Sequence, residues 1–103
     1  MRILFLGDIV GPSGCNIVKR FLPDIIKKKD LDFVVANGEN AAENGLGITE
    51  KISKELFSCG IDVLTTGNHV WDQKETAEHI EKEKKLLRPY NLISPSPGKG
   101  FEI

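Results

Sequence analysis

The chain has 103 residues, with 14 Lys and Arg against 15 Asp and Glu, so its formal net charge is −1. This length excludes two separate folded domains, and a charge near zero excludes nucleic-acid binding through a general cationic footprint. No apolar run approaches the roughly 20 residues that cross a bilayer, and the apolar start is too short for a signal segment. We therefore expect a cytoplasmic protein with no membrane partner. Cys15 and Cys59 lack a C-x-x-C spacing, which favours free, partly buried thiols.

The first third of the chain predicts a strand, a helix and a second strand. Residues 2–6 (RILFL) form a largely apolar run, which is typical of a strand buried on both faces of a parallel sheet. Apolar residues recur at helical spacing over 17–26, and three lysines at 27–29 suit a helix C-terminus. Pro23 should kink or restart this helix because it lacks an N–H. Residues 32–36 predict the second buried strand.

The middle of the chain repeats the pattern. Thr49 suits an N-cap, and the apolar positions after it predict a helix that stops at Gly60. Residues 61–65 predict the third strand. Asp72 and Glu75 resemble a capping box for a third helix, which we expect to run into the charged residues 81–85. Two i,i+4 pairs, Glu78 with Lys82 and Glu81 with Lys85, make that stretch a solvated helix face rather than a binding patch.

The last residues predict a fourth short strand over 90–93 and a turn-rich connector over 94–100. Residues 101–103 look like a further strand that has only begun. We therefore expect residues 1–103 to form a single α/β domain that is incomplete at its C-terminal end.

Strands alternate with helices, which predicts an α/β fold with a mainly parallel sheet flanked by helices. Ligands of such sheets bind outside the carboxyl ends of the strands. Each of three predicted strands ends in a glycine followed by a polar residue, and these exits supply Asp8, Glu39, Asn40 and Asn68. Singly, such residues are usually turn formers or helix caps. Together their oxygens predict a site for divalent metal ions.

The two histidines receive different interpretations. His69 follows Asn68 at the same edge, where an imidazole can donate a proton to a leaving oxygen, although a structural histidine is the alternative. His79 lies in the charged third helix and is interpreted as structural. Trp71 and Tyr90 are interpreted as packing residues, because no second aromatic accompanies either of them.

Four motifs in this order are very specific: residues 7–11 (GDIVG), 37–42 (NGENAA), 66–72 (TGNHVWD) and 88–91 (RPYN). They closely resemble the YmdB-like metallophosphoesterases, a bacterial branch of the calcineurin-like phosphoesterase superfamily. The resemblance implies the N-terminal part of a layered α/β/β/α fold. It also implies a phosphodiesterase that opens 2′,3′-cyclic nucleotides at the 2′ side and leaves a 3′-phosphate, using a hydroxide activated by two metal ions, iron or manganese.

By this resemblance, Asp8 and Asn40 hold one metal, Glu39 bridges, Asn68 holds the second, and His69 donates the proton. The wider superfamily has His where this chain has Val10 and Asp where it has Glu39, and both departures are normal for the YmdB-like branch. The family also draws metal-ligating histidines from a second half of the fold, and no histidine follows His79.

Two hypotheses remain open at this point. One is a hydrolase that acts as part of a longer chain and forms homo-oligomers. The other is a catalytically inactive, truncated or regulatory module that binds phosphate or a nucleotide. We expect no measurable phosphodiesterase activity from the 103 residues by themselves.

Overall fold

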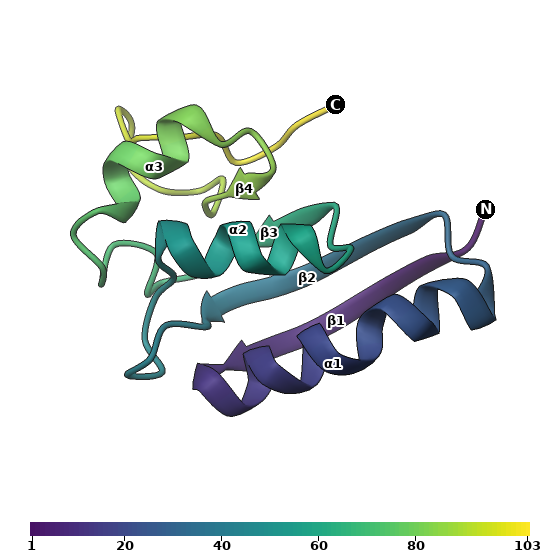
Figure 1. The fold of residues 1–103 in the computed structure, drawn as a ribbon. Coiled ribbons are helices and arrows are strands. Elements are labelled where there is room, and N and C mark those ends of the chain that lie inside the picture. Colours follow the sequence, from purple (N-terminus) through teal and green to yellow (C-terminus); the bar gives the residue numbers. More distant parts are fainter.

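The computed structural model describes residues 1–103 and contains four strands that alternate with three helices (Figure 1). The elements are β1 (Ile3–Val10), α1 (Gly11–Lys29), β2 (Phe33–Asn40), α2 (Glu50–Ser58), β3 (Val63–Thr65), α3 (Thr76–Lys82) and β4 (Leu86–Leu87). The strands form one sheet in the order β1-β2-β3-β4, and every neighbouring pair is parallel. The predicted α/β class, with a parallel sheet flanked by helices, is confirmed.

The prediction that the first strand is buried on both faces is wrong. Along β1, Leu4 and Leu6 pack against the core, whereas Ile3 and Phe5 are 59% and 65% exposed. Helices α1 and α2 lie side by side and are joined by an ion pair between Lys19 and Glu55 at 2.9 Å. Because both helices cover the same face of the sheet, the side chains that alternate to the other face remain uncovered.

Helix α1 is continuous through Pro23, so the expected restart does not occur. Cys15 and Leu22 are buried on the side of α1 that faces the sheet, whereas Pro23 is exposed. Packing therefore continues across the position where proline removes a backbone hydrogen bond. The helix ends at Lys29, and the cap residue Asp30 has a left-handed backbone from which its N–H donates to the carbonyls of Ile26 and Lys27.

The predicted cap of the second helix is confirmed, because the hydroxyl of Thr49 accepts the backbone N–H of Ile52 at 3.2 Å. The predicted capping box of the third helix is wrong. The carboxylate of Glu75 accepts the backbone N–H of Glu50 at 3.2 Å and so serves the start of α2. Asp72 instead bonds to a histidine ring, and α3 begins only at Thr76.

Helix α3 ends at Lys82, before the end of the charged segment. The Glu78–Lys82 ion pair forms at 3.3 Å. The expected Glu81–Lys85 pair does not form, because Glu81 accepts the backbone N–H of Gly98 at 3.1 Å. The C-terminal segment therefore binds the side chain of Glu81, which the helical pattern predicts to face solvent.

The fourth strand is β4, so the strand predicted over 90–93 is wrong. Leu86 is 1% exposed beside Leu64, whereas Ile93 is 89% exposed. The apolar residues at 90–93 therefore lack a place in the sheet, and residues 101–103 form no strand either. Tyr90 lies at the surface, with its ring 5.9 Å from that of Phe101.

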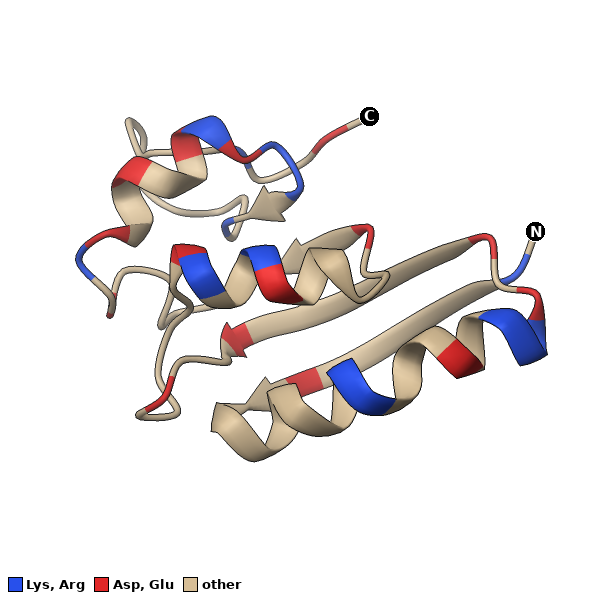
Figure 2. Cartoon of the chain, in the orientation of Figure 1, with Lys and Arg blue, Asp and Glu red and all other residues tan.

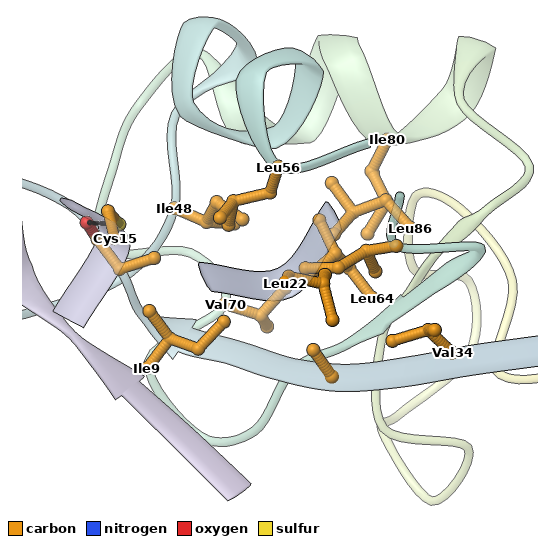
Figure 3. Packing of buried hydrophobic residues seen from close by; sticks show 13 residues of the cluster. Ile9, Cys15, Leu22, Val34, Ile48, Leu56, Leu64, Val70, Ile80 and Leu86 are labelled. Carbon is orange, nitrogen blue, oxygen red and sulfur yellow. Dashed lines mark hydrogen bonds between the residues drawn. The ribbon is translucent and has the colours of Figure 1, made fainter. Parts of the chain in front are cut away.

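The core lies between the sheet and the helices that cover it (Figure 3). Ile48, Leu56 and Leu64 are wholly inaccessible to solvent at its centre. Trp71 packs against this cluster, as expected of a packing residue, and the two cysteines are free thiols. None of the three helices combines the length and the apolar character that crossing a membrane requires.

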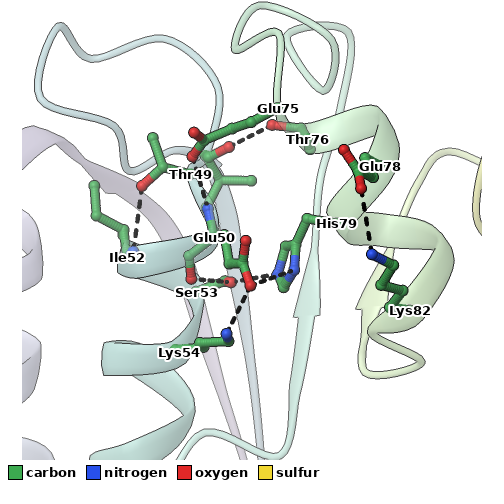
Figure 4. Close-up of polar contacts among 11 residues, drawn as sticks. Thr49, Glu50, Ile52, Ser53, Lys54, Glu75, Thr76, Glu78, His79 and Lys82 are labelled. Atoms are coloured by element: carbon green, nitrogen blue, oxygen red, sulfur yellow. Dashed lines mark hydrogen bonds and ion pairs between the residues drawn. The ribbon is translucent and has the colours of Figure 1, made fainter.

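His79 has the structural role that its place in a charged helix suggests. Its side chain is 5% exposed, and Nε2 lies 2.8 Å from the hydroxyl of Ser53, which itself donates to the carbonyl of Glu50 (Figure 4). The serine hydroxyl has only one proton, so Nε2 carries the proton that it shares with Ser53. This bond links α3 to α2.

Candidate metal centre

The carboxyl ends of β1 and β2 bring acidic side chains together at one edge of the sheet. Figure 2 shows acidic positions at the ends of both strands. The strands extend to Val10 and Asn40, so Asp8 and Asn40 belong to the last residues of strands and not to the loops after them. Register shifts on either side of Asp8 pair it with Asn37 and pair Val10 with Asn40. As a result of these shifts, the last residues of β1 and β2, Val10 and Asn40, lie directly opposite each other.

Asp8 and Asn40 are in direct contact. The side-chain amide of Asn40 donates to both carboxylate oxygens of Asp8, with Nδ2 at 3.2 Å from Oδ1 and 3.0 Å from Oδ2. A carboxylate only accepts, so the NH2 group of Asn40 must face Asp8 and its oxygen must face away. That oxygen, Oδ1, is buried and has no hydrogen-bond partner.

An unpaired buried carbonyl oxygen is costly, and either a bound water or a cation satisfies it. The carboxylate of Asp8 lies on the amide-nitrogen side of Asn40, and Glu39 is the preceding residue of β2, where successive side chains alternate between the two faces. Oxygen ligands of this kind suit a hard or borderline divalent ion. The residue types at this edge are therefore those that a metal ion would need, but the structure does not bring them together into one set of ligands.

Glu39 faces the segment that follows β3. Its Oε1 accepts the backbone N–H of His69 at 3.3 Å. The carboxylate also fills the space where a side chain at position 67 would begin, so any residue other than glycine there would require Glu39 to move. The carboxylate of Glu39 thus connects the carboxyl end of β2 to the loop that follows β3.

Asn68 lies between these two contacts but is exposed, and its side chain forms no hydrogen bond. The structure therefore brings Asp8 together with Asn40, and Glu39 together with the backbone of residues 67–69. It does not place the amide of Asn68 against any of the predicted ligands. No three or more His, Cys, Asp or Glu side chains of the chain converge into a set that could hold a metal ion.

The ring of His69 contacts Asp72, with Nδ1 2.8 Å from Oδ2. The two side chains are 34% and 37% exposed. A turn holds them on the same side, because the N–H of Asp72 donates to the carbonyl of His69 at 3.0 Å. Nδ1 is therefore occupied, and Nε2 is the ring nitrogen left for other partners.

A cavity of about 700 Å³ lies near this edge, between the first turns of α1 and α2. Its walls include Cys15, Lys19 and Glu55, and none of the five predicted site residues. Lys19 and Glu55 form an ion pair across it. Because the predicted site residues lie at the strand ends and not in this cavity, the strand ends are the candidate site.

Comparison with protein families settles the relationship of the chain. The model of the family described as YmdB-like protein matches residues 4–103. The chain belongs to this family. The membership expected from the four motifs is thereby confirmed.

The YmdB-like chain is similar to a 2′,3′-cyclic-nucleotide 2′-phosphodiesterase of Bacillus subtilis strain 168, with 47% identity over 101 residues. This alignment covers 98% of the chain but 38% of the relative. The chain therefore spans less than half the length of that protein.

Two solved structures share the fold. A hypothetical protein from Thermus thermophilus superposes with a TM-score of 0.89 at 40% identity, covering 99% of this chain and 39% of that one. A phosphatase from Mycoplasma pneumoniae superposes with a TM-score of 0.87 at 37% identity, covering 98% and 38%. The YmdB-like chain thus has the fold of a part of phosphatase structures.

Two residues of this edge receive no site role in the sequence-based prediction. The sequence predicts Asp72 as a helix cap, because it lies three residues before Glu75 as in a capping box, and this role is wrong. Its spacing from His69, three residues earlier, is the signal that a turn could pair the two side chains. Gly67 belongs to a recognised motif, but its contact with Glu39 depends on how β2 and β3 pair.

Proposed function

We propose that this chain belongs to a cytoplasmic, metal-dependent phosphodiesterase that hydrolyses 2′,3′-cyclic nucleotides at the 2′ side and leaves a 3′-phosphate. The observation that carries the proposal is the contact of Asn40 with the carboxylate of Asp8, which leaves Oδ1 of Asn40 buried and unpaired on the side away from that carboxylate. Such an atom at the carboxyl edge of a parallel sheet is able to bind a cation, and a cation there suits a phosphate ligand. The name of the Bacillus subtilis relative supports the substrate class.

In this proposal Asp8 and Asn40 would hold one ion, Asn40 through the Oδ1 that now faces away from Asp8, Asn68 would hold a second ion, and Glu39 would be shared by the two. The ions are iron or manganese, and when bound they neutralise developing charge on the phosphoryl group and activate water. The protein's task is to place these oxygens. The contact of Glu39 with Gly67 and the N–H of His69 limits where its carboxylate can move.

His69 acts as the proton donor in the same proposal. With Nδ1 bonded to Asp72, Nε2 is the nitrogen that can reach a substrate. Opening the cyclic phosphate at the 2′ side expels the 2′ oxygen, which needs a proton. Nε2 supplies that proton, so the leaving group departs as a hydroxyl.

Glu39→Gln in the complete protein tests the proposal. A neutral amide cannot neutralise two cations, so metal content and turnover should fall together while the thermal unfolding midpoint stays unchanged. Glu43→Gln is the matched control, since Glu43 is exposed and forms no ion pair. Full metal stoichiometry and near-native turnover in the Glu39 variant would contradict the bridging role.

The second candidate function is a phosphate- or nucleotide-binding module without turnover. The donor set favours it for the 103 residues by themselves, because two of the four predicted ligands are neutral amides and no acidic or histidine triad forms. We therefore expect the chain to bind at most one Mn²⁺ ion weakly and to hydrolyse no nitrophenyl phosphodiester. Calorimetric titration with Mn²⁺ and a turnover assay distinguish the two, since two tight sites with turnover would exclude the inactive module.

We also propose that the chain self-associates. Its uncovered sheet face carries Ile3, Phe5 and Phe33, each at least 38% exposed. Apolar surface of this kind favours association. Sedimentation equilibrium that fits one monomeric species at high concentration would contradict this.

A further inference from the structure

The segment that follows β4 carries an aromatic side chain that the proposed chemistry does not use. Tyr90 lies three residues beyond Leu87, the last residue of β4, and is 74% exposed. It belongs neither to the core cluster nor to the residues packed against it, so it does not have the packing role that the sequence predicts. An exposed aromatic ring offers a flat apolar face to a ligand.

The strand register places Tyr90 at the edge of the sheet that holds the candidate metal centre. One row of paired residues crosses the four parallel strands and consists of Asp8, Asn37, Thr65 and Leu87. Asn68 and Tyr90 each lie three residues beyond this row. Neighbouring strands are about 4.8 Å apart, so the ends of β2 and β4 are separated by about 10 Å. The ribose of a nucleotide separates its base from its phosphate by a span of this order.

Backbone contacts hold the turn that carries Tyr90. The side chain of Arg88 donates from Nε to the carbonyl of Pro97 at 3.0 Å, and its backbone N–H donates to the carbonyl of Lys99 at 2.9 Å. Gly100 packs so closely on the turn that a Cβ there would lie 2.6 Å from the Cα of Tyr90. Tyr90 is therefore held in place without a ligand, and such preorganisation lowers the entropic cost of binding.

A second aromatic ring supports that of Tyr90. The ring centroids of Tyr90 and Phe101 are 5.9 Å apart and their planes cross at 63°, which is an edge-to-face arrangement. This contact favours one orientation of the Tyr90 ring. Phe101 is itself 58% exposed, so the two rings form a small aromatic surface outside the core. Aromatic side chains at a protein surface are what nucleobases stack on.

The cations of the same segment are already engaged. Residues 88–103 contain two, Arg88 and Lys99. Arg88 is bonded to backbone carbonyls, and Lys99 forms an ion pair with Glu102 at 3.2 Å. What this segment offers to a ligand is therefore a ring surface and not a charge. A nucleobase, which is flat and uncharged, fits this chemistry, and a phosphate group does not.

We propose that Tyr90, supported by Phe101, is a stacking surface for the base of the nucleotide whose cyclic phosphate is held at the candidate metal centre. This role rests on the proposed phosphodiesterase function and adds recognition of a part of the substrate that the chemistry does not touch. Tyr90 is a binding residue in this role and not a catalytic one. Stacking accepts every base and is stronger for the larger purines, so we expect a lower KM for 2′,3′-cyclic AMP than for 2′,3′-cyclic UMP.

Steady-state kinetics of the complete protein test the stacking surface with two substrates. 2′,3′-Cyclic AMP carries a base, whereas glycerol 1,2-cyclic phosphate contains the same cyclic ester without a base. Tyr90→Ala should raise KM for cyclic AMP by about 5-fold to 150-fold, the usual effect of losing one stacked base, and leave kcat nearly unchanged. Its kinetics with glycerol cyclic phosphate should match those of the parent protein. Equal losses with both substrates would overturn the stacking role.

Conservative variants distinguish stacking from general apolar contact. Tyr90→Phe keeps a flat ring and should keep the parental KM for cyclic AMP, whereas Tyr90→Leu has no aromatic face and should behave like Tyr90→Ala. Ile93→Ala is the matched control, because Ile93 is 89% exposed on the same segment and should affect neither substrate. All these positions are exposed, so the thermal unfolding midpoints should not change. Parental kinetics in Tyr90→Leu would show that the aromatic face is irrelevant.

Binding of a product tests the same contact without turnover. Calorimetric titration of the complete protein with adenosine 3′-phosphate and with ribose 3-phosphate compares one phosphate with and without a base. The parent protein should bind adenosine 3′-phosphate about 5-fold to 150-fold more tightly, and Tyr90→Ala should lose most of this ratio. A ratio that is unchanged in Tyr90→Ala would overturn the inference.

These experiments separate the stacking surface from the proposed function. If the complete protein hydrolyses neither cyclic phosphate, the phosphodiesterase function is wrong, and the titration still decides whether Tyr90 binds a base. If the protein hydrolyses both substrates with the same kcat/KM and Tyr90→Ala changes neither, the stacking surface is wrong and the phosphodiesterase function remains.

Discussion

The carboxylate of Glu39 occupies the space beside the Cα of Gly67 in which any other residue would carry its Cβ. Its Oε1 also accepts the N–H of His69, two residues further along the chain. The exit of β2 thus packs directly on the exit of β3, and a site that depends on Glu39 depends on a glycine at position 67.

Gly67→Ala should therefore displace Glu39 and weaken metal binding, with little loss of folding stability, because the displaced atoms are the end of a flexible side chain. We expect lower affinity for Mn²⁺ by calorimetry and a nearly unchanged thermal midpoint. Gly7→Ala is the control, since a Cβ there would meet no atom within 4 Å. Equal effects of the two variants would show that the Gly67 contact is irrelevant to the site.

His69→Ala should affect the chemistry and leave metal binding intact, because its ring contacts Asp72 and none of the predicted ligands. In the complete protein, turnover should fall by about 10²-fold to 10⁴-fold, the usual value of a general acid. Turnover of substrates with a nitrophenolate leaving group should fall least, since that leaving group departs without a proton. Loss of metal together with activity would instead make His69 a ligand or a structural residue.

Thr49→Ala should lower the free energy of unfolding by about 0.5–2 kcal/mol, the typical contribution of an N-cap. Its hydroxyl accepts the N–H of Ile52, which otherwise has no partner in the first turn of α2. Urea titration measures the change. Ser13→Ala, at an exposed position of α1, should stay within about 0.5 kcal/mol of the parent chain.

The two thiols should respond to pH in a predictable direction. Burial raises the pKa of Cys15 and of Cys59. Alkylation by iodoacetamide, which needs the thiolate, should therefore be slower in the folded chain than in urea. Above about pH 8.5 the unfolded chain loses these protons first. Stability should accordingly fall as the pH rises through that range, and a rise in unfolding free energy there would contradict the burial.

The order of the elements and the chemistry of the strand ends follow from the sequence. Apolar runs that end in glycine and a polar residue recur three times. Such local patterns predict strands reliably, because apolar side chains are buried when the chain folds. Thr49 as a cap is equally local, since its partner is three residues away. The family motifs place Asp8, Glu39 and Asn68 at strand ends on the same grounds.

Other features depend on contacts between distant segments, and only the tertiary structure decides them. The apolar residues of β1 lie partly in solvent because both neighbouring helices cover the same face. Leu86, and not Ile93, enters the sheet because it lies beside Leu64. The contact of Glu39 with Gly67 and the unpaired oxygen of Asn40 likewise arise from strand pairing across some thirty residues, a distance at which local sequence patterns carry no information about which atoms meet.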